Sequence, residues 1–277
     1  MTVLQVVQAT TAYLEKRGIG SARLNAEHLI AHALSKKRLD VYLEFERELN
    51  EAELAPLREL VRRRGQCEPL QHLLGTVEFC GAIFQCDKRA LIPRPETEQL
   101  VDLVIARMEN QTPRILDVGT GSGVIALALA RRVQAAEIVA TDVSEEALAL
   151  ARENAVRLAV ENVQFAAGDL LGEVTGTFDV IVANLPYISR KDRDQLAPEV
   201  LRDPEIALFG GERGDEVLHR LIETAPPHLR PGGLLALEIG LGQEGALTAL
   251  MQEKKYRDIQ TKNDYTGVTR FLFARYG

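Results

Sequence analysis

The residues Asn184, Leu185, Pro186 and Tyr187 could together hold a planar, neutral nitrogen group. They follow the apolar run Val180 to Val182, which is typical of a buried central strand. Ligands of open α/β sheets bind beyond the carboxyl ends of the strands, so chemistry is expected here. The Asn184 side-chain oxygen and the Leu185 carbonyl can each accept one N–H of an NH2 group, and the Tyr187 ring can lie against its plane. Taken alone, the four residues could equally form a turn after a strand, since Asn and Pro are common in turns.

A second set of candidate residues lies in ILDVGTGSGVIALALA, which predicts a strand, a glycine-rich turn and an apolar helix. The glycines let the backbone approach a ligand closely at a helix N-terminus. Asp142 ends the next strand, EIVATD, and suits an acceptor for ribose hydroxyls. Asp169 follows the third strand, where it could accept from an adenine amino group, with Val143 and Leu170 as apolar neighbours of the ring. The turn residues expected at the cofactor are Gly119, Thr120, Gly121, Ser122 and Gly123, and Asn184 is expected to border the cofactor as well.

A glycine turn with a distant acidic residue occurs both in NAD enzymes and in S-adenosylmethionine methyltransferases. The dinucleotide pattern G-x-G-x-x-G requires a glycine where this chain has Val124, so no pyrophosphate need fit. A G-x-S-x-G elbow and a G-x-x-x-x-G-K-[ST] phosphate loop are absent from the sequence. The five histidines are scattered and the three cysteines lack metal-ligand spacing, so we expect no metal.

Composition favours a soluble, cytosolic protein with a sizeable core. Hydrophobic residues make up 46% of the 277 residues, and no run approaches the roughly 18 apolar residues of a membrane span. The start, MTVLQVVQAT, lacks a basic segment followed by a long apolar one. The net charge of −7 disfavours binding to a phosphate backbone.

Residues 1–74 read as a small helical domain that contains no catalytic constellation. Ser21 is expected to cap the second helix, a short third helix is expected over Val41 to Glu46, and Asn50 with Glu53 forms a capping-box pattern. Pro56 should kink the fourth helix or shift its start. The basic clusters 36–38 and 62–64 are either solvated faces or a docking surface.

Residues 75–92 change to a period of two and predict a β-hairpin linker around Gly81. Residues 93–277 then alternate strands and helices, with a fifth strand expected over Gly232 to Gly240 and two final strands around Gly267. The fold class is therefore α/β: a Rossmann-like, seven-stranded and mostly parallel sheet with a small helical N-terminal domain. Arg94 and Glu96, in the segment LIPRPETEQLV, could belong to a structural loop or to the site.

These motifs together resemble the class I methyltransferases that act on planar nitrogens. LLGTVEFCGAIFQCDKRALIPRPETE, LEIG and DYTGVTRFLFARY extend the resemblance over nearly the full chain to the HemK/PrmC family of peptide chain release factor N5-glutamine methyltransferases. The resemblance implies S-adenosylmethionine as cofactor, with Gly119 to Gly123 at its methionine part, Asp142 at the ribose and Asp169 with Leu170 at the adenine. It also implies that residues 184–187 hold the glutamine of a Gly-Gly-Gln motif and that the helical domain helps dock the release factor. Separately, we expect a monomer that does not bind nucleic acid directly.

One residue departs from the family pattern, which is usually Asn-Pro-Pro-Tyr. Leu185 replaces the first proline. The carbonyl acceptor survives, and because Leu185 precedes Pro186 it is biased to extended conformations, so we expect only a modest loss of rigidity.

Three functions are compatible with the sequence. The first is the release factor glutamine methyltransferase. The second is a related enzyme that methylates a ribosomal-protein glutamine or adenine in nucleic acid, and the acidic charge argues against the nucleic-acid branch. The third is a cofactor-binding protein that only docks translation factors, against which the complete set of residues 184–187 argues.

Overall fold

The computed structural model describes residues 1–172 and 174–277, which form two compact units. The first unit comprises Met1–Thr76 together with Ala197–Arg202, and the second comprises Val77–Leu196 with Asp203–Gly277. Each unit has its own hydrophobic clusters.

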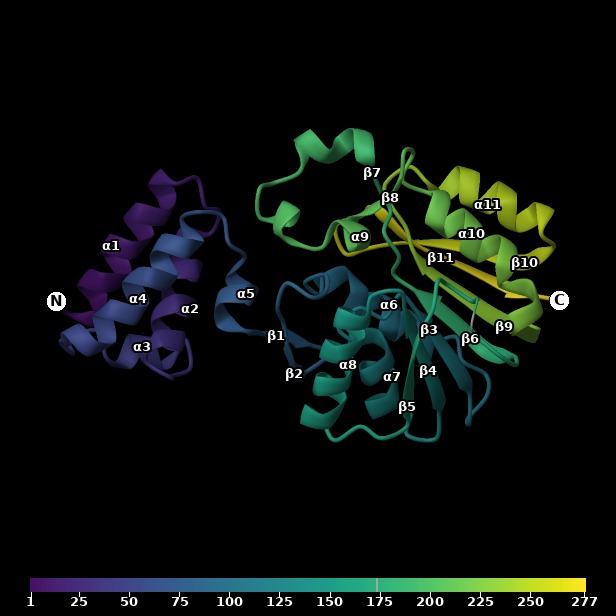
Figure 1. Ribbon diagram of the computed structural model, residues 1–277, viewed down its shortest axis with the longest axis horizontal. Coiled ribbons are helices and arrows are strands. Elements are labelled where there is room, and N and C mark those ends of the chain that lie inside the picture. Colours follow the sequence, from purple (N-terminus) through teal and green to yellow (C-terminus); the bar gives the residue numbers. More distant parts are fainter. Residues whose placement is uncertain (173) are drawn as a thin grey trace. The chain divides into compact units, whose positions relative to one another are not determined.

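The first unit is built from helices around a core that includes Val3, Leu29, Ile30 and Leu57. Its helices are α1 Val3–Lys16, α2 Ala22–Ala33, α3 Asp40–Leu43, α4 Glu51–Arg64 and α5 Leu70–Leu74 (Figure 1). The buried Arg64 side chain donates to Asn25 Oδ1 (2.7 Å) and to Glu199 Oε2 (2.6 Å). The segment Ala197–Arg202 is thus fastened to this unit by a buried cation.

The structure confirms one of the two helix caps that the sequence predicts in this unit. The capping box at Asn50 is present, with the Asn50 side chain accepting from Glu53 N and the Glu53 side chain from Asn50 N. The expectation for Ser21 was wrong in detail: it precedes α2, but its left-handed backbone (φ 48°) makes no side-chain cap. A capping side chain normally requires the extended conformation that Ser21 lacks. Pro56 lies inside α4, which begins at Glu51 and continues past it.

The short third helix spans Asp40–Leu43 rather than Val41 to Glu46. The basic clusters of this unit are paired internally. Arg38 contacts Glu27, Arg62 contacts Glu59 and Arg63 contacts Glu68.

The second unit opens with a hairpin of β1 Thr76–Phe79 and β2 Ala82–Gln85. Its two turn residues, Cys80 and Gly81, both have positive φ (47° and 70°), which is the geometry of a type I′ turn and matches the twist of a hairpin.

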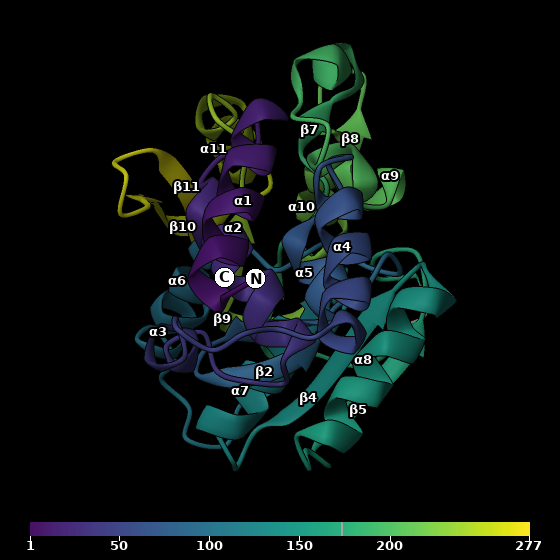
Figure 2. The same ribbon diagram turned by 90° about the vertical axis from the view of Figure 1, so that its left-hand side faces the viewer.

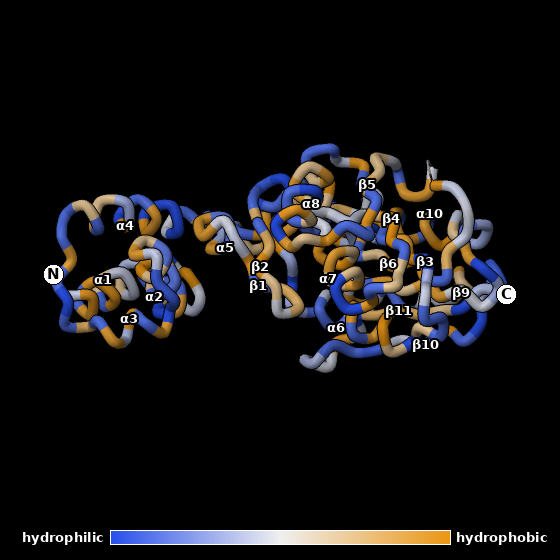
Figure 3. The backbone as a smooth tube through the Cα atoms, turned by 90° about the horizontal axis from the view of Figure 1, so that it is seen from below, coloured by the Kyte–Doolittle hydropathy of each residue, from blue (hydrophilic) through white to orange (hydrophobic). Residues whose placement is uncertain are grey.

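A seven-stranded sheet forms the centre of the second unit, in the order β10-β11-β9-β6-β3-β4-β5. Five strands are parallel, and β11 and β10 pair antiparallel at one edge. The hydropathy colouring of Figure 3 shows hydrophobic residues along β4 and β6, as expected for strands covered on both faces. The strands are β3 Arg114–Val118, β4 Glu137–Asp142, β5 Val163–Ala167, β6 Phe178–Ala183, β9 Leu229–Glu238, β10 Tyr256–Asn263 and β11 Thr269–Tyr276. The strand expected over Gly232 to Gly240 therefore begins three residues earlier and ends at Glu238.

Helices cover both faces of this sheet (Figure 1). One face packs against α6 Pro95–Ile105, α7 Val124–Arg132 and α8 Glu145–Arg157, and the other against α10 Glu216–Thr224 and α11 Glu244–Glu253. A small pair, β7 Ile188–Ser189 and β8 Phe209–Gly211, follows β6 (Figure 2). The remaining short elements are α9 Glu205–Leu208, η1 Arg190–Gln195, η2 Val200–Arg202 and η3 Pro226–His228.

The strand order reverses at β3, whose neighbours are β4 on one side and β6 on the other. Val118 pairs with Ala183, so the next residues, Gly119 and Asn184, leave the sheet side by side. Such a switch point is where open α/β sheets bind ligands. None of the helices that the structure describes is long and apolar enough to cross a membrane.

Candidate active site

A cavity of about 340 Å³ opens at this switch point. Its volume lies in the range of about 300–1,000 Å³ usual for small-molecule sites. It is lined by four of the five turn residues, Gly119 to Ser122, and by Asp142, Val143, Asp169, Leu170, Asn184, Leu185 and Pro186. The structure therefore brings together both sets of residues that the sequence singled out, except that Tyr187 and Gly123 are not among the described residues that line the cavity.

The glycine turn is shaped for close approach of a ligand. Gly119, Gly121 and Gly123 have φ of 72°, 57° and 84°, a region that residues with a Cβ rarely adopt. A Cβ at Gly119 would lie 2.6 Å from Leu185 Cδ2, whereas one at Gly121 would meet only Ala90, at 3.9 Å. The turn thus packs against Leu185 at one end and leaves room for a ligand at its centre.

Backbone-directed hydrogen bonds hold the turn and Asp142 together. Asp142 Oδ2 accepts from Gly121 N (2.8 Å) and Oδ1 from Ser144 N (2.9 Å). Burial raises the pKa of Asp142, and these N–H groups oppose that shift. Each carboxylate oxygen keeps a lone pair for a ligand hydroxyl.

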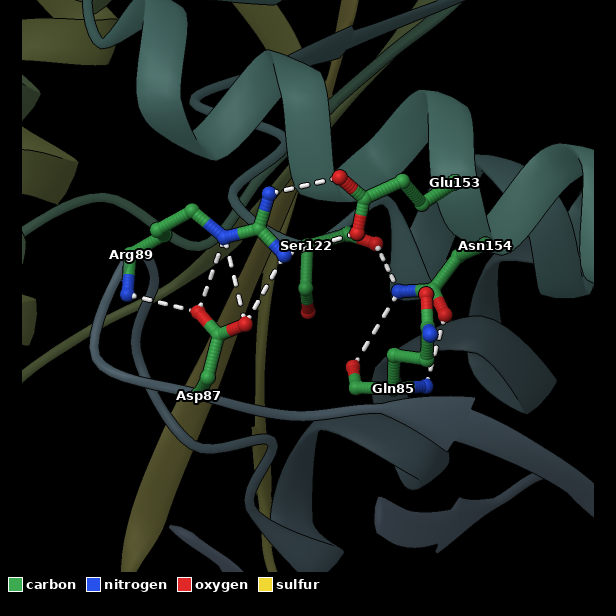
Figure 4. Close-up of polar contacts among 6 residues, drawn as sticks. All are labelled: Gln85, Asp87, Arg89, Ser122, Glu153 and Asn154. Carbon is green, nitrogen blue, oxygen red and sulfur yellow. Dashed lines mark hydrogen bonds and ion pairs between the residues drawn. The ribbon is translucent and has the colours of Figure 1, made fainter. Parts of the chain in front are cut away.

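Two further buried residues support the turn, and the sequence reasoning did not single them out. Asp117 accepts from Thr120 Oγ1 (2.6 Å) and Ala126 N (3.1 Å), and burial raises its pKa to about 7. Asn154, on α8, donates to Ser122 O (3.0 Å) and Gln85 O (3.2 Å) and accepts from Gln85 N (2.6 Å), as Figure 4 shows. Asn154 therefore ties β2 to the glycine turn.

A second contact between the segment after β2 and α8 lies on the surface. Arg89 is held between Asp87 and Glu153 (Figure 4). It is itself a wall of the cavity, and Asp87 and Glu153 are both substantially exposed.

Asp169 is arranged differently from Asp142. Its side chain is 60% exposed and pairs with Arg220 at 2.6 Å, and both residues line the cavity. Leu170 is buried in the adjacent apolar cluster and has a positive φ of 54°. Val143, at the same edge, is 55% exposed.

Asn184 is held by side chains from distant elements. Its Nδ2 donates to Thr97 Oγ1 (3.0 Å), and Thr97 Oγ1 donates to Glu238 Oε2 (2.8 Å). Thr97 accepts one of the two N–H groups of Nδ2, which orients the amide so that Oδ1 can accept from a ligand. Thr97 lies in the PRPETE segment and Glu238 in the LEIG segment, the two motifs that the sequence matched without a role.

Tyr187 is not among the described residues that line the cavity. Its hydroxyl donates to Glu238 Oε1 (3.3 Å), and burial raises its pKa far above the ordinary value. Its carbonyl accepts from Gln243 Nε2 (2.9 Å), whose Oε1 accepts from Gly240 N (2.8 Å). The contact expected between the Tyr187 ring and the plane of an amide stays a prediction.

Arg94, whose role the sequence left open, lines the cavity and pairs with the buried Asp203 at 2.7 Å. Asp203 Oδ1 also accepts from Ile92 N (3.3 Å), and burial raises its pKa to about 6. The PRPETE segment is thus joined to the start of α9 beside the cavity.

The residues around this cavity fit S-adenosylmethionine. The open centre of the turn leaves room for the methionine part of the cofactor to approach the backbone closely. Asp142 offers hydrogen-bond acceptors at the end of β4, and Val143 and Leu170 offer apolar surface beside Asp169. No cluster of His, Cys, Asp or Glu suited to a metal ion occurs in the part of the chain that the structure describes.

Comparison with known proteins gives matches in both units. Residues 5–75 match the family described as PrmC N-terminal domain, and residues 97–212 match the methyltransferase small domain. The release factor glutamine methyltransferase of Geobacter sulfurreducens is 38% identical over 100% of this chain and 97% of its own length. That of Deinococcus radiodurans is 39% identical over 99% of both. A 16S rRNA methyltransferase of T. thermophilus, solved with AdoMet and guanosine, shares the fold at 22% identity, with a TM-score of 0.53 over 73% of this chain and 50% of that one.

Fold and site together define an S-adenosylmethionine-dependent methyltransferase of class I, as the sequence predicted. The chain belongs to the release factor glutamine methyltransferase family, because relatives of that name match it over its full length.

Proposed function

We propose that this chain transfers a methyl group from S-adenosylmethionine to the side-chain nitrogen of the glutamine in the Gly-Gly-Gln motif of peptide chain release factors. The observation that carries the proposal is the orientation of Asn184, whose Nδ2 is engaged by Thr97 so that an acceptor oxygen is left at the cavity. The names of the full-length relatives support the choice of substrate.

The chemistry must overcome the poor nucleophilicity of a carboxamide nitrogen, whose lone pair is delocalised into its carbonyl. Asn184 Oδ1 and the Leu185 carbonyl accept the two N–H groups, push electron density back onto nitrogen and aim it in line with the methyl group. The cofactor, when bound, supplies that methyl group on a sulfonium. The methylated amide nitrogen is strongly acidic, so water can take its proton and Asn184 need not act as a base.

Asp142 is proposed to hold the ribose hydroxyls, the glycine turn the methionine part, and Asp169 with Leu170 the adenine. Residues 1–74 are proposed as the docking domain for the release factor, 75–92 as a linker and 93–277 as the catalytic domain. Leu39 and Leu43 support the docking role, since they are 68% and 84% exposed and, being four residues apart around α3, share a face. We also propose that the enzyme works in the cytosol as a monomer and needs no nucleic acid, in keeping with its net charge of −7.

The test is methyl transfer from labelled S-adenosylmethionine to purified, folded release factor. The matched control substrate carries Ala in place of the glutamine of the Gly-Gly-Gln motif, and ribosomal proteins and DNA are assayed in parallel. We expect label on the release factor alone, and none on the Ala variant. Label on a ribosomal protein or on DNA, with an unlabelled release factor, would overturn the proposal.

The docking role is tested with Leu43→Asp, for which Leu24→Asp, at another exposed leucine, is the control. We expect Leu43→Asp to raise KM for the folded release factor by about three- to tenfold, as expected for loss of an apolar contact at an interface. The activity on a short Gly-Gly-Gln peptide should be unchanged, since such a peptide gains little from remote docking. An unchanged KM for the folded substrate would remove this face from the docking surface.

A further inference from the structure

The side chains behind Asn184 form a directed chain of hydrogen bonds that ends on a buried carboxyl group. Asn184 Nδ2 donates to Thr97 Oγ1 at 3.0 Å, and Thr97 Oγ1 donates to Glu238 Oε2 at 2.8 Å. Thr97 is 2% exposed and Glu238 is 1% exposed, so water does not compete for these bonds. The three residues come from the end of β6, the first turn of α6 and the end of β9.

The ionised carboxylate of Glu238 fixes the direction of every bond in this chain. A carboxylate only accepts, so the single hydroxyl proton of Thr97 must point to Glu238. The lone pairs of Thr97 are then directed at Asn184, which must present its NH2 group to them. The NH2 group of Asn184 is thereby turned toward Thr97, and the amide oxygen is placed to accept from a ligand.

We propose that Glu238 is a positioning residue that acts through Thr97 to keep Asn184 an acceptor, and that this fixed polarity makes the site select a carboxamide over a carboxylate. The inference rests on the proposed function and deepens it. A glutamine side chain brings two N–H donors to Asn184 Oδ1 and the Leu185 carbonyl. A glutamate side chain brings only oxygens, which these two acceptors repel.

Loss of the carboxylate charge would allow the hydrogen bonds from Asn184 to Glu238 to reverse their direction. A protonated Glu238 can donate to Thr97, whose hydroxyl then turns to donate to Asn184 Oδ1, and the amide flips so that NH2 faces the ligand. Burial raises the pKa of Glu238 to about 7, with the Thr97 and Tyr187 hydroxyl groups and the Arg270 charge acting to lower it and Glu96 acting to raise it. We therefore expect the change between the two hydrogen-bond directions, in which Asn184 presents its oxygen or its NH2 group to the ligand, to occur near neutral pH.

Three variants separate this role from simple packing. Glu238→Gln keeps the shape and removes the charge, Thr97→Val keeps the volume and removes the hydroxyl, and Thr97→Ser keeps the hydroxyl. Each is assayed on folded release factor and on the same factor with Glu in place of the motif glutamine, the latter as a competitive inhibitor. Binding of S-adenosylmethionine and thermal unfolding serve as checks of the folded site.

We expect Glu238→Gln and Thr97→Val to lower kcat by about 10- to 100-fold, the range for a buried polar group left badly paired. The preference for the glutamine factor over the glutamate factor, measured as the inhibition constant of the latter divided by KM of the former, should fall at least about tenfold in both variants. Thr97→Ser should retain both quantities, and cofactor affinity should stay within about twofold throughout. The acid limb of kcat/KM near pH 7 in the wild type should disappear in Glu238→Gln.

A measurement on the free enzyme distinguishes failure of this inference from failure of the proposed function. The side-chain amide resonance of Asn184, identified by its loss in Asn184→Ala, should shift with a midpoint near pH 7 in the wild type and not in Glu238→Gln or Thr97→Val. If the wild type is inactive on release factor but shows this titration, only the proposed substrate is overturned. Unchanged glutamine preference in both variants, or an amide resonance that does not titrate in the wild type, would overturn the role of Glu238.

Discussion

The cofactor side and the amide side of the cavity are supported in different ways. The glycine turn is held largely by neighbours in sequence and by backbone groups: Thr120 bonds Asp117, and Asp142 bonds the N–H groups of Gly121 and Ser144. Asn184 is held by Thr97, which lies 87 residues away in the chain. Thr97 is in turn held by Glu238, 141 residues from Thr97. The first arrangement fixes the shape of a backbone, and the second fixes the orientation of a single side chain.

This difference suggests that the two sides should respond separately to mutation. Changes on the amide side should lower turnover and spare cofactor affinity. Changes on the cofactor side should lower cofactor affinity or stability first.

The largest effect is expected for Asn184→Ala. Removing an oriented acceptor of the reacting amide should lower kcat by about 10²- to 10³-fold, by analogy with the loss of one preorganised hydrogen bond in a transition state. Calorimetry should show cofactor affinity within a few-fold of the wild type. Normal turnover in a variant that still binds the cofactor would remove Asn184 from the reaction.

Glu238→Gln should alter the pH dependence of stability. Burial raises the pKa of Glu238 to about 7, against an ordinary value of 4.5. The folded state therefore prefers the protonated form, and the wild type loses stability as the pH rises from about 4.5 through about 7. The loss is on the order of 3 kcal/mol at 1.36 kcal/mol per pKa unit.

Urea unfolding of the wild type and Glu238→Gln at pH 5 and pH 8 measures this effect. The variant should gain stability relative to the wild type at pH 8 compared with pH 5. An equal difference at both pH values would show that Glu238 titrates as an ordinary glutamate.

Asn154→Ala tests whether the turn depends on its side-chain support from helix α8. The substitution leaves the Gln85 and Ser122 backbone groups without their buried partner and should reduce the free energy of unfolding by about 2–3 kcal/mol. The adjacent Glu153→Ala is the matched control, because its exposed pair with Arg89 should contribute at most about 1 kcal/mol. Equal destabilisation by both would assign the effect to helix α8 in general.

Asp142→Ala should weaken cofactor binding by about 1.5–3 kcal/mol, the range for hydrogen bonds to charged groups. Asp169→Ala should cost at most about 1 kcal/mol, because that carboxylate is 60% exposed and already paired with Arg220. Isothermal titration with S-adenosylmethionine measures both. An unchanged dissociation constant for Asp142→Ala would exclude it from the ribose site.

The same contrast explains what the sequence could predict. The apolar run at Val180 to Val182 and the glycine spacing at Gly119 predicted the fold and the edge of the sheet at which the cavity opens, because strand periodicity and turn conformation are local properties. Thr97 and Glu238 could not be assigned, since nothing in the spacing of PRPETE and LEIG indicates that the start of α6 lies against the end of β9, beside β6. Ser21 shows the opposite failure: its residue type suits a cap, but its left-handed backbone prevents one.

The close packing of Leu185 against Gly119, where an added Cβ would lie 2.6 Å from Leu185 Cδ2, gives the two halves of the cavity a common wall. A shift of the glycine turn is therefore expected to shift Leu185, whose carbonyl we propose accepts from the substrate amide. We expect binding of the methyl donor and of the methyl acceptor to be thermodynamically coupled through this contact, so that each changes the affinity of the other by the same factor. Because Leu185 stands where the family usually has proline, this contact is made by a flexible side chain rather than by a rigid ring.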